Sequence, residues 1–138
     1  MIKIKSFTFN PFQENSYVLY DESKEAIIID PGCYEQSEKE ALKKFISENE
    51  LKPVKLLNTH GHIDHVLGNS FVKKAFDLEL TIGNKDLQTL ESVAAYAPNY
   101  GFPMYEPAVA DNFIEEGDLI NFGQSQLEVI FLPGHAPG

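Results

Sequence analysis

The sequence predicts a mixed α/β (α+β) fold in which a helix crosses over between two parallel strands of a sheet. Three observations support this prediction: period-two alternation of side chains at the N-terminus, a helical repeat over residues 35–49, and a short apolar run at 54–58 directly after it. Strand, helix and strand in this order favour a βαβ crossover with the helix packed on the sheet.

The N-terminal part of the chain contains three predicted strands. Residues 2–9 alternate apolar and polar side chains, as a strand with one buried face does, and Asn10-Pro11 ends that strand. Residues 16–20 form the second strand, and residues 26–29 form a third whose continuous apolar run indicates burial on both faces. We therefore expect two antiparallel hairpins.

Helical spacing dominates the middle of the chain. Residues 35–49 place apolar side chains at helical spacing among charged ones, which predicts an amphipathic helix. The strand at 54–58 follows it, and helical spacing returns after His65 and continues to Phe76. A further helix is expected from Asn84 or Asp86 to Ala97.

The C-terminal part begins with a long segment rich in proline, glycine and aromatic residues, 98–111. This segment is interpreted either as a binding loop or lid, or as an irregular connector whose aromatic side chains cover the core. Residues 119–122 and 127–132 then predict a hairpin across Gly123-Gln124-Ser125. With no internal repeat or linker, residues 1–138 are expected to form one domain.

Composition restricts the partners of the chain. The 138 residues are 43% hydrophobic, enough for a core, and carry a net charge of −10. This charge disfavours nucleic acid and anionic membrane surfaces, which bind through Lys and Arg. One cysteine, Cys33, excludes an internal disulfide and is interpreted as a packing residue. The sequence shows neither an export signal nor a membrane span, so the cytoplasm is the expected location.

The most specific chemical signal is the run Thr59-His60-Gly61-His62-Ile63-Asp64-His65. The chain has only four histidines; three are in this run, and the fourth, His135, follows a Pro-Gly turn. Histidines two apart on an extended segment point to the same side, so His60 and His62 can share a metal ion. His135 would complete three protein ligands with an open position, the arrangement of a catalytic metal site.

The residues around these histidines extend the candidate site. Asp64 and His65 are placed to lean toward a second ion, and Asp64 is also the candidate catalytic carboxylate. Imidazole and carboxylate ligands suit zinc, iron or manganese. Asp30 and Thr59 either orient a ligand through a hydrogen bond or serve only as turn or cap residues, and both interpretations stay open.

These residues resemble the metallo-β-lactamase superfamily, and within it the branch that looks like glyoxalase II. The resemblance rests on the runs at 10–15, 29–32, 59–65 and 133–138, whose order spans nearly the whole chain. It implies a four-layer αββα sandwich with a dinuclear metal site at one edge of the two sheets.

The resemblance also implies a division of the ligands between two ions. His60, His62 and His135 would bind the first metal, and Asp64 and His65 the second. The family continues past the Pro-Gly-His turn with further strands and helices, including an aspartate that bridges both metals and a last histidine for the second.

This chain ends at Gly138, so the resemblance predicts an incomplete sandwich with the first half and part of the second. We expect the second metal to bind weakly or not at all. Activity of these 138 residues is expected to be low or nil. The apolar sheet face that the missing half would cover is expected to favour self-association.

The leading functional expectation is a metal-dependent hydrolase that acts, in its intact form, on a small-molecule thioester or ester. Zinc is the expected cofactor, two ions in the intact site, with iron or manganese as alternatives. Two further interpretations stay open: a mononuclear-iron persulfide (sulfur) dioxygenase of the same superfamily, and a non-catalytic metal-binding fragment. A nuclease is disfavoured by the net charge of −10.

Overall fold

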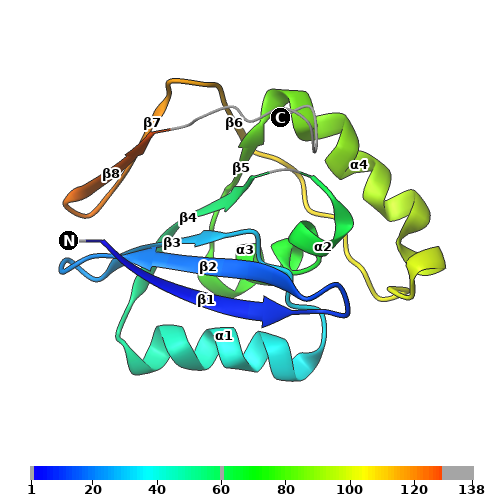
Figure 1. The fold of residues 1–138 in the computed structure, drawn as a ribbon, viewed down its shortest axis with the longest axis horizontal. Helices are drawn as coiled ribbons and strands as arrows, with labels where there is room; N and C mark the ends of the chain where they lie inside the picture. The colour runs from blue at the N-terminus through cyan, green and yellow to red at the C-terminus, as the bar shows by residue number, and fades with distance from the viewer. Residues whose placement is uncertain (1, 60, 129–138) are drawn as a thin grey trace.

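A six-stranded mixed sheet forms the centre of the computed structural model, which describes residues 2–59 and 61–128 (Figure 1). The strands lie in the sheet in sequence order: β1 (Lys3–Phe9), β2 (Glu14–Tyr20), β3 (Glu25–Ile29), β4 (Lys52–Asn58), β5 (Leu80–Gly83) and β6 (Asn112–Ile114). β1, β2 and β3 pair antiparallel, which confirms the two predicted hairpins. β3 and β4 pair parallel, as do the pairs that follow, so the predicted βαβ crossover is confirmed.

Helices connect the parallel strands. They are α1 (Gln36–Glu48), α2 (Ile63–Val66), α3 (Asn69–Phe76) and α4 (Leu87–Tyr96), with short 3-10 turns η1 (Asn84–Asp86) and η2 (Ala97–Tyr100). Figure 1 shows α1 running along the sheet below β1 and β2. The predicted helices at 35–49 and 84–97 are confirmed within two or three residues at their ends.

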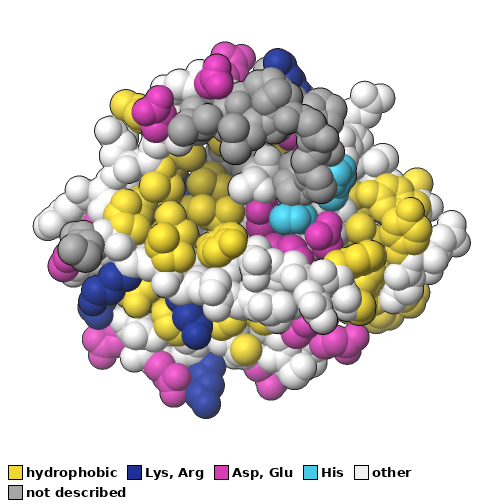
Figure 2. All heavy atoms as spheres, viewed as in Figure 1, with side chains coloured by type: hydrophobic (Ala, Val, Ile, Leu, Met, Phe, Trp, Pro, Cys, Tyr) yellow, Lys and Arg dark blue, Asp and Glu magenta, His cyan; other side chains and the backbone are white. Residues whose placement is uncertain are grey.

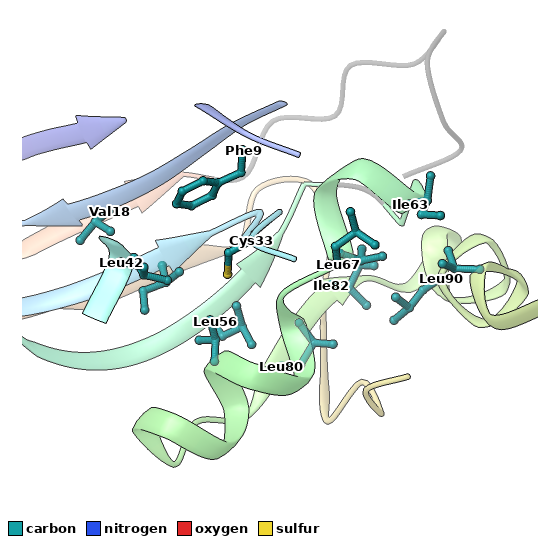
Figure 3. Packing of buried hydrophobic residues seen from close by; sticks show 14 of the residues in the cluster. Phe9, Val18, Cys33, Leu42, Leu56, Ile63, Leu67, Leu80, Ile82 and Leu90 are labelled. Atoms are coloured by element: carbon teal, nitrogen blue, oxygen red, sulfur yellow. The ribbon is translucent and has the colours of Figure 1, made fainter. Parts of the chain in front are cut away.

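The two faces of the sheet carry separate apolar clusters, because neighbouring strand residues point to opposite faces. On the helix side, Ile28 and Leu56 pack with Leu42 of α1 and Val72 of α3. Figure 3 shows this cluster between the strands and helices. On the far side, Ile27 and Leu57 pack beneath a separate hairpin, β7 (Leu119–Phe122) and β8 (Ser125–Glu128). β3 is therefore buried on both faces, as its apolar run predicts.

The helical run after His65 is divided into α2 and α3, a break that its apolar spacing does not indicate. The Gly68 N–H donates to the carbonyl of Pro31 at 2.7 Å, so the helical ladder stops there. An added Cβ at Gly68 would lie 2.8 Å from that same Pro31 oxygen, which leaves room only for glycine. The turn after β3 therefore fixes where α2 ends.

Two parts of the C-terminal prediction need correction. β5 and β6, of four and three residues, carry too short a pattern to be recognised, and we did not predict them. The second strand of the hairpin begins at Ser125 rather than at Leu127, since Phe122 pairs with Ser125 and leaves a two-residue turn. The predicted continuation at 129–132 lies outside the described residues.

The segment at 98–111 contains no strand after η2 and acts as a core-covering connector. Phe102 is 2% exposed, and its ring meets that of Tyr34 edge-on at a centroid distance of 4.9 Å. Glu106 accepts hydrogen bonds from Ser70 and Lys74 of α3 at 3.2 and 2.7 Å. The connector is thus attached to the helix side of the sheet.

Asp21 joins the C-terminal hairpin to the sheet. Its carboxylate accepts hydrogen bonds from the Gln124 N–H at 2.8 Å and the Ser125 hydroxyl at 2.7 Å, besides two from Ser23. The hydrogen bonds from Ser23 and Ser125 hold the pKa of Asp21 well below its usual range. This carboxylate therefore tethers the turn of the hairpin as an anion.

None of the helices within residues 2–59 and 61–128 combines the length and the apolar character that a membrane crossing requires.

Candidate metal centre

The turn that follows β4 carries the described part of the histidine motif. His62 has an extended backbone, with φ −67° and ψ 150°, and caps the N-terminus of α2, whose single turn contains Asp64 and His65. The motif therefore occupies a loop and the first turn of a helix, as predicted. His60 and His135 lie outside the described residues, so the three-histidine set stays a prediction.

Gly61 allows α4 to approach this turn closely. An added Cβ would lie 2.6 Å from the Leu90 backbone nitrogen and 3.1 Å from the Asp86 carbonyl oxygen. Backbone atoms at such distances cannot rotate away, so a side chain at this position would push the start of α4 outward. The glycine between the two histidines is thus a packing requirement.

Asp30 orients His65. It follows β3 with a left-handed backbone, φ 51°, and is 2% exposed. Its carboxylate accepts hydrogen bonds from the Thr59 N–H at 2.7 Å and the Thr59 hydroxyl at 2.5 Å. The same carboxylate lies 3.0 Å from His65 Nδ1. A histidine that donates from Nδ1 keeps the lone pair of Nε2 for a metal ion.

Asp64 lies on the opposite side of the His65 ring from Asp30. His65 Nε2 lies 3.3 Å from Asp64 Oδ2, so an imidazole nitrogen and a carboxylate oxygen converge on one point. Burial by itself lowers the pKa of His65, but the hydrogen bond and charge of Asp30, with the charges of Asp64 and Glu14, raise it above its ordinary value. The surroundings of this ring therefore favour a positive charge.

Glu14 is a site residue that sequence reasoning missed. It is 4% exposed; its Oε2 accepts a hydrogen bond from the Ser16 hydroxyl at 2.8 Å, and that hydroxyl accepts one from the Gly32 N–H at 2.9 Å. Its Oε1 has no hydrogen-bond partner among residues 2–59 and 61–128, and it lies 3.6 Å from His65 Nδ1. Burial raises the pKa of Glu14 to about 8, although the Ser16 hydrogen bond opposes the rise.

The donor atoms of this corner fit a cation. Carboxylate oxygens of Glu14 and Asp30 and a ring nitrogen of His65 lie within 4.8 Å of one another, and Glu14 Oε1 is buried without a donor from the described part of the chain. The Asp30 contact lies on the Nδ1 side of the His65 ring, and Asp64 lies on its Nε2 side. Nitrogen and oxygen donors in this mixture suit zinc, iron or manganese.

The charges around the candidate site are visible on one face of the molecule. Figure 2 shows histidine side chains beside acidic ones, with hydrophobic side chains gathered to either side. This face can thus attract a cation and also contact an apolar group.

The mixed sheet, its covering helices and the histidine turn at the end of β4 together define a class of α/β proteins with a candidate metal site at the end of a strand. The family model of the metallo-beta-lactamase superfamily matches residues 9–138, and the chain belongs to that superfamily. The mixed sheet with its covering helices is the corresponding part of the metallo-β-lactamase fold, as predicted.

Named relatives share this part of the chain. This chain is 35% identical to the hydroxyacylglutathione hydrolase GloC of Haemophilus influenzae over an alignment of 139 residues. The alignment covers 99% of this chain and 64% of GloC. The structure of the B3 metallo-beta-lactamase BLEG-1 superposes with a TM-score of 0.84 at 31% identity, covering 99% of this chain and 64% of BLEG-1.

A third relative, TTHA1623, was solved in a di-iron-bound form. It superposes with a TM-score of 0.79 at 32% identity over 97% of this chain and 63% of TTHA1623. This chain therefore spans less than two thirds of the length of these relatives.

Proposed function

We propose that the protein is a metal-dependent hydrolase of the glyoxalase II-like branch, acting in its intact form on a thioester or ester of a small acid. The observation that carries the proposal is the His65 ring, which Asp30 holds through Nδ1 while Nε2 faces Asp64. A family of metallo-hydrolases and the likeness to GloC support the same reaction class.

We propose His60, His62 and His135 as ligands of a first metal, and Asp64 and His65 as ligands of a second. Zinc is the proposed metal because imidazole and carboxylate donors suit it; the di-iron form of TTHA1623 keeps iron as an alternative, with manganese. When bound, such an ion supplies Lewis acidity and makes water available as a nucleophile at neutral pH.

Residues of this chain prepare the site before any ion arrives. Asp30 fixes the ring orientation and tautomer of His65, and Thr59 holds Asp30 in place with two hydrogen bonds. The carboxylate of Asp64, which is the candidate catalytic residue, lies where it can bind a cation or accept a proton from a group beside His65 Nε2.

For these 138 residues taken alone we propose little or no hydrolytic activity. Asp64 and His65 supply only two ligands to the second ion, and a catalytic zinc normally has three protein ligands. Residues that grip the substrate are proposed to belong mainly to the part of the relatives that this chain does not span.

Self-association through the far face of the sheet is a further part of the proposal. The hairpin β7–β8 covers Ile27 and Leu57, but Ile4 at the β1 edge of this face is 65% exposed, and Leu119 on the outer side of the hairpin is 55% exposed. Apolar surface of this kind favours contact with a second copy. Light scattering after size exclusion tests this, and a well-behaved monomer would contradict it.

Elemental analysis, combined with thioester and persulfide assays, tests the reaction class on these 138 residues and on the longest chain that the gene encodes. We expect zinc and cleavage of a hydroxyacylglutathione thioester by the longer chain. One iron per chain with oxygen consumption on a persulfide would overturn the hydrolase proposal in favour of a dioxygenase.

His62→Ala tests the proposed ligands separately from the reaction. Loss of metal is expected in the variant, with an unfolding midpoint close to that of the metal-free parent. Undiminished metal content would refute the assignment of His62 as a ligand, whichever reaction the intact protein performs.

A further inference from the structure

We infer that Asn10 is a positioning residue for the metal-binding turn: its side-chain amide holds the backbone of Asp64 and thereby the place of α2. This inference rests on the proposed role of Asp64 and His65 as ligands. Asn10 lies in the turn between β1 and β2, 54 residues from Asp64 along the sequence.

The side chain of Asn10 connects two segments of the candidate site. Its Nδ2 donates to the Gly32 carbonyl at 3.1 Å and to the Asp64 carbonyl at 3.0 Å, while its Oδ1 accepts from the Phe12 N–H at 3.0 Å. A flipped amide would set an oxygen against two carbonyl oxygens, so the contacts fix which atom is the nitrogen. Both side-chain donors are therefore used on the turn after β3 and on α2.

The carbonyl of Asp64 needs this partner because α2 is one turn long. In a continuing helix the Gly68 N–H would reach the Asp64 carbonyl, but it donates to Pro31 instead, at 2.7 Å. Asn10 supplies the missing donor from outside the helix. A buried carbonyl without a partner costs about 1–3 kcal/mol, so this hydrogen bond restricts where α2 can lie.

Asn10 is itself held on both sides. Its N–H donates to Glu38 Oε2 of α1 at 2.6 Å, and its carbonyl accepts from the Gln13 N–H at 3.0 Å. The residue before it, Phe9, is 4% exposed and packs in the core (Figure 3). The hydrogen bonds of Asn10 thus link the turn that carries Asp64 and His65 to β1 and α1.

The backbone of Asn10 offers a matched control in the same turn. Asn10 and Gln13 both have left-handed backbones, φ 56° and φ 55°, so Asn10→Gly and Gln13→Gly relieve the same strain. The Gln13 side chain is exposed. The difference between the two variants therefore isolates the amide of Asn10.

Two measurements on the 138-residue chain test the inference. In metal-free protein, the backbone amide signals of residues 64–68 are expected to shift in Asn10→Gly and to stay in place in Gln13→Gly. In a zinc titration followed by the imidazole C–H signals of His65, Asn10→Gly is expected to weaken the affinity about tenfold, and Gln13→Gly less than twofold. Unfolding midpoints in urea show that both variants are folded.

Unchanged amide signals in Asn10→Gly would overturn the inference. Shifted signals with an unchanged zinc affinity would also overturn it, because the position of α2 would then not control the ligands. Zinc that leaves the His65 signals of the parent chain unmoved would agree with the weak second ion expected from two ligands, Asp64 and His65. In that case the amide signals of residues 64–68 alone decide whether Asn10 holds α2.

Discussion

Replacing Gly32 by alanine measures how tightly the turn after β3 packs against the metal-binding turn. The added Cβ would lie 2.5 Å from the Asp64 carbonyl oxygen and 2.7 Å from Asn10 Nδ2, and it would also contact Glu14 Oε2. Ordinary contacts of a Cβ begin near 3.4 Å. The backbone of Asp64 and the amide of Asn10 must therefore each move away from residue 32 by several tenths of an ångström.

The expected loss of stability follows from these contacts. Overpacking costs about 1–3 kcal/mol, and weakening the two hydrogen bonds of the Asn10 amide costs about 1 kcal/mol each. Alanine also lowers the conformational entropy of the unfolded chain, which offsets about 0.4–1 kcal/mol of this loss of stability. Together these contributions predict that Gly32→Ala lowers the free energy of unfolding by about 2–5 kcal/mol.

Urea unfolding followed by circular dichroism measures this loss. With a slope of about 2 kcal/mol per molar urea, the midpoint is expected to fall by about 1–2.5 M. Gly117→Ala is the control: no atom of residues 2–59 and 61–128 lies within 4 Å of its added Cβ, and its left-handed backbone, φ 90°, opposes the change. That strain costs about 1–2 kcal/mol and should leave the amide signals of Asp64 and His65 in place.

An unfolding midpoint of Gly32→Ala equal to that of the parent chain, with unmoved signals for Asp64 and His65, would contradict this prediction. A midpoint lowered no more than in Gly117→Ala, again with unmoved signals, would show that the turn accommodates a methyl group. Either result would mean that the contacts between the turn after β3 and α2 are looser than the structure shows.

Three further predictions concern the core, the thiol and the acid response. Leu56→Ala, at a fully buried position, should lower the free energy of unfolding by about 2–5 kcal/mol in urea, while Leu119→Ala, 55% exposed, should change it by about 0.5 kcal/mol or less. Burial raises the pKa of Cys33 to about 12, so a disulfide reagent at pH 8 should label it only after unfolding; rapid labelling of the folded chain would contradict this. Hydrogen bonds lower the pKa of Asp21 in the folded chain, so its contribution to stability is present above the unfolded pKa of about 3.9 and is lost as the pH falls through the folded value. Asp21→Asn should flatten the acid limb of the stability profile, and an unaltered limb would show that another carboxylate causes it.

The sequence predicts the strands and helices whose side-chain period is long enough to recognise. β1 and α1 each present seven or more residues with a consistent pattern, the shorter apolar run at 54–58 predicts β4, and the order of these elements also predicts the crossover. β5 and β6 are too short for a period, and their pairing depends on neighbours far along the chain. Tertiary context, rather than local pattern, determines such short strands.

The site residues divide in the same way: some are predicted from one short run of sequence, and others depend on contacts between segments far apart in the chain. Histidine spacing predicts that His62, Asp64 and His65 gather at a strand end, because all three lie in one short run. The roles of Asn10 and Glu14 depend on hydrogen bonds and burial that arise only when the first hairpin packs against α2. The local sequence shows a glutamate shortly after Asn10-Pro11, and this does not indicate a partner.

The tether between Asp21 and the β7–β8 hairpin has a consequence for the order of folding. Asp21 meets Gln124 and Ser125 across 103 and 104 residues, whereas the β1–β2–β3 meander and the β3–α1–β4 unit close much shorter loops. Long loops close later because their closure costs more entropy, so the hairpin is expected to dock after the helix-side core has formed. The same separation lets the hairpin detach as a cooperative unit, with lower hydrogen-exchange protection in β7 and β8 than in β3 and β4. Each detachment would uncover Ile27 and Leu57 while the helix-side core stays folded.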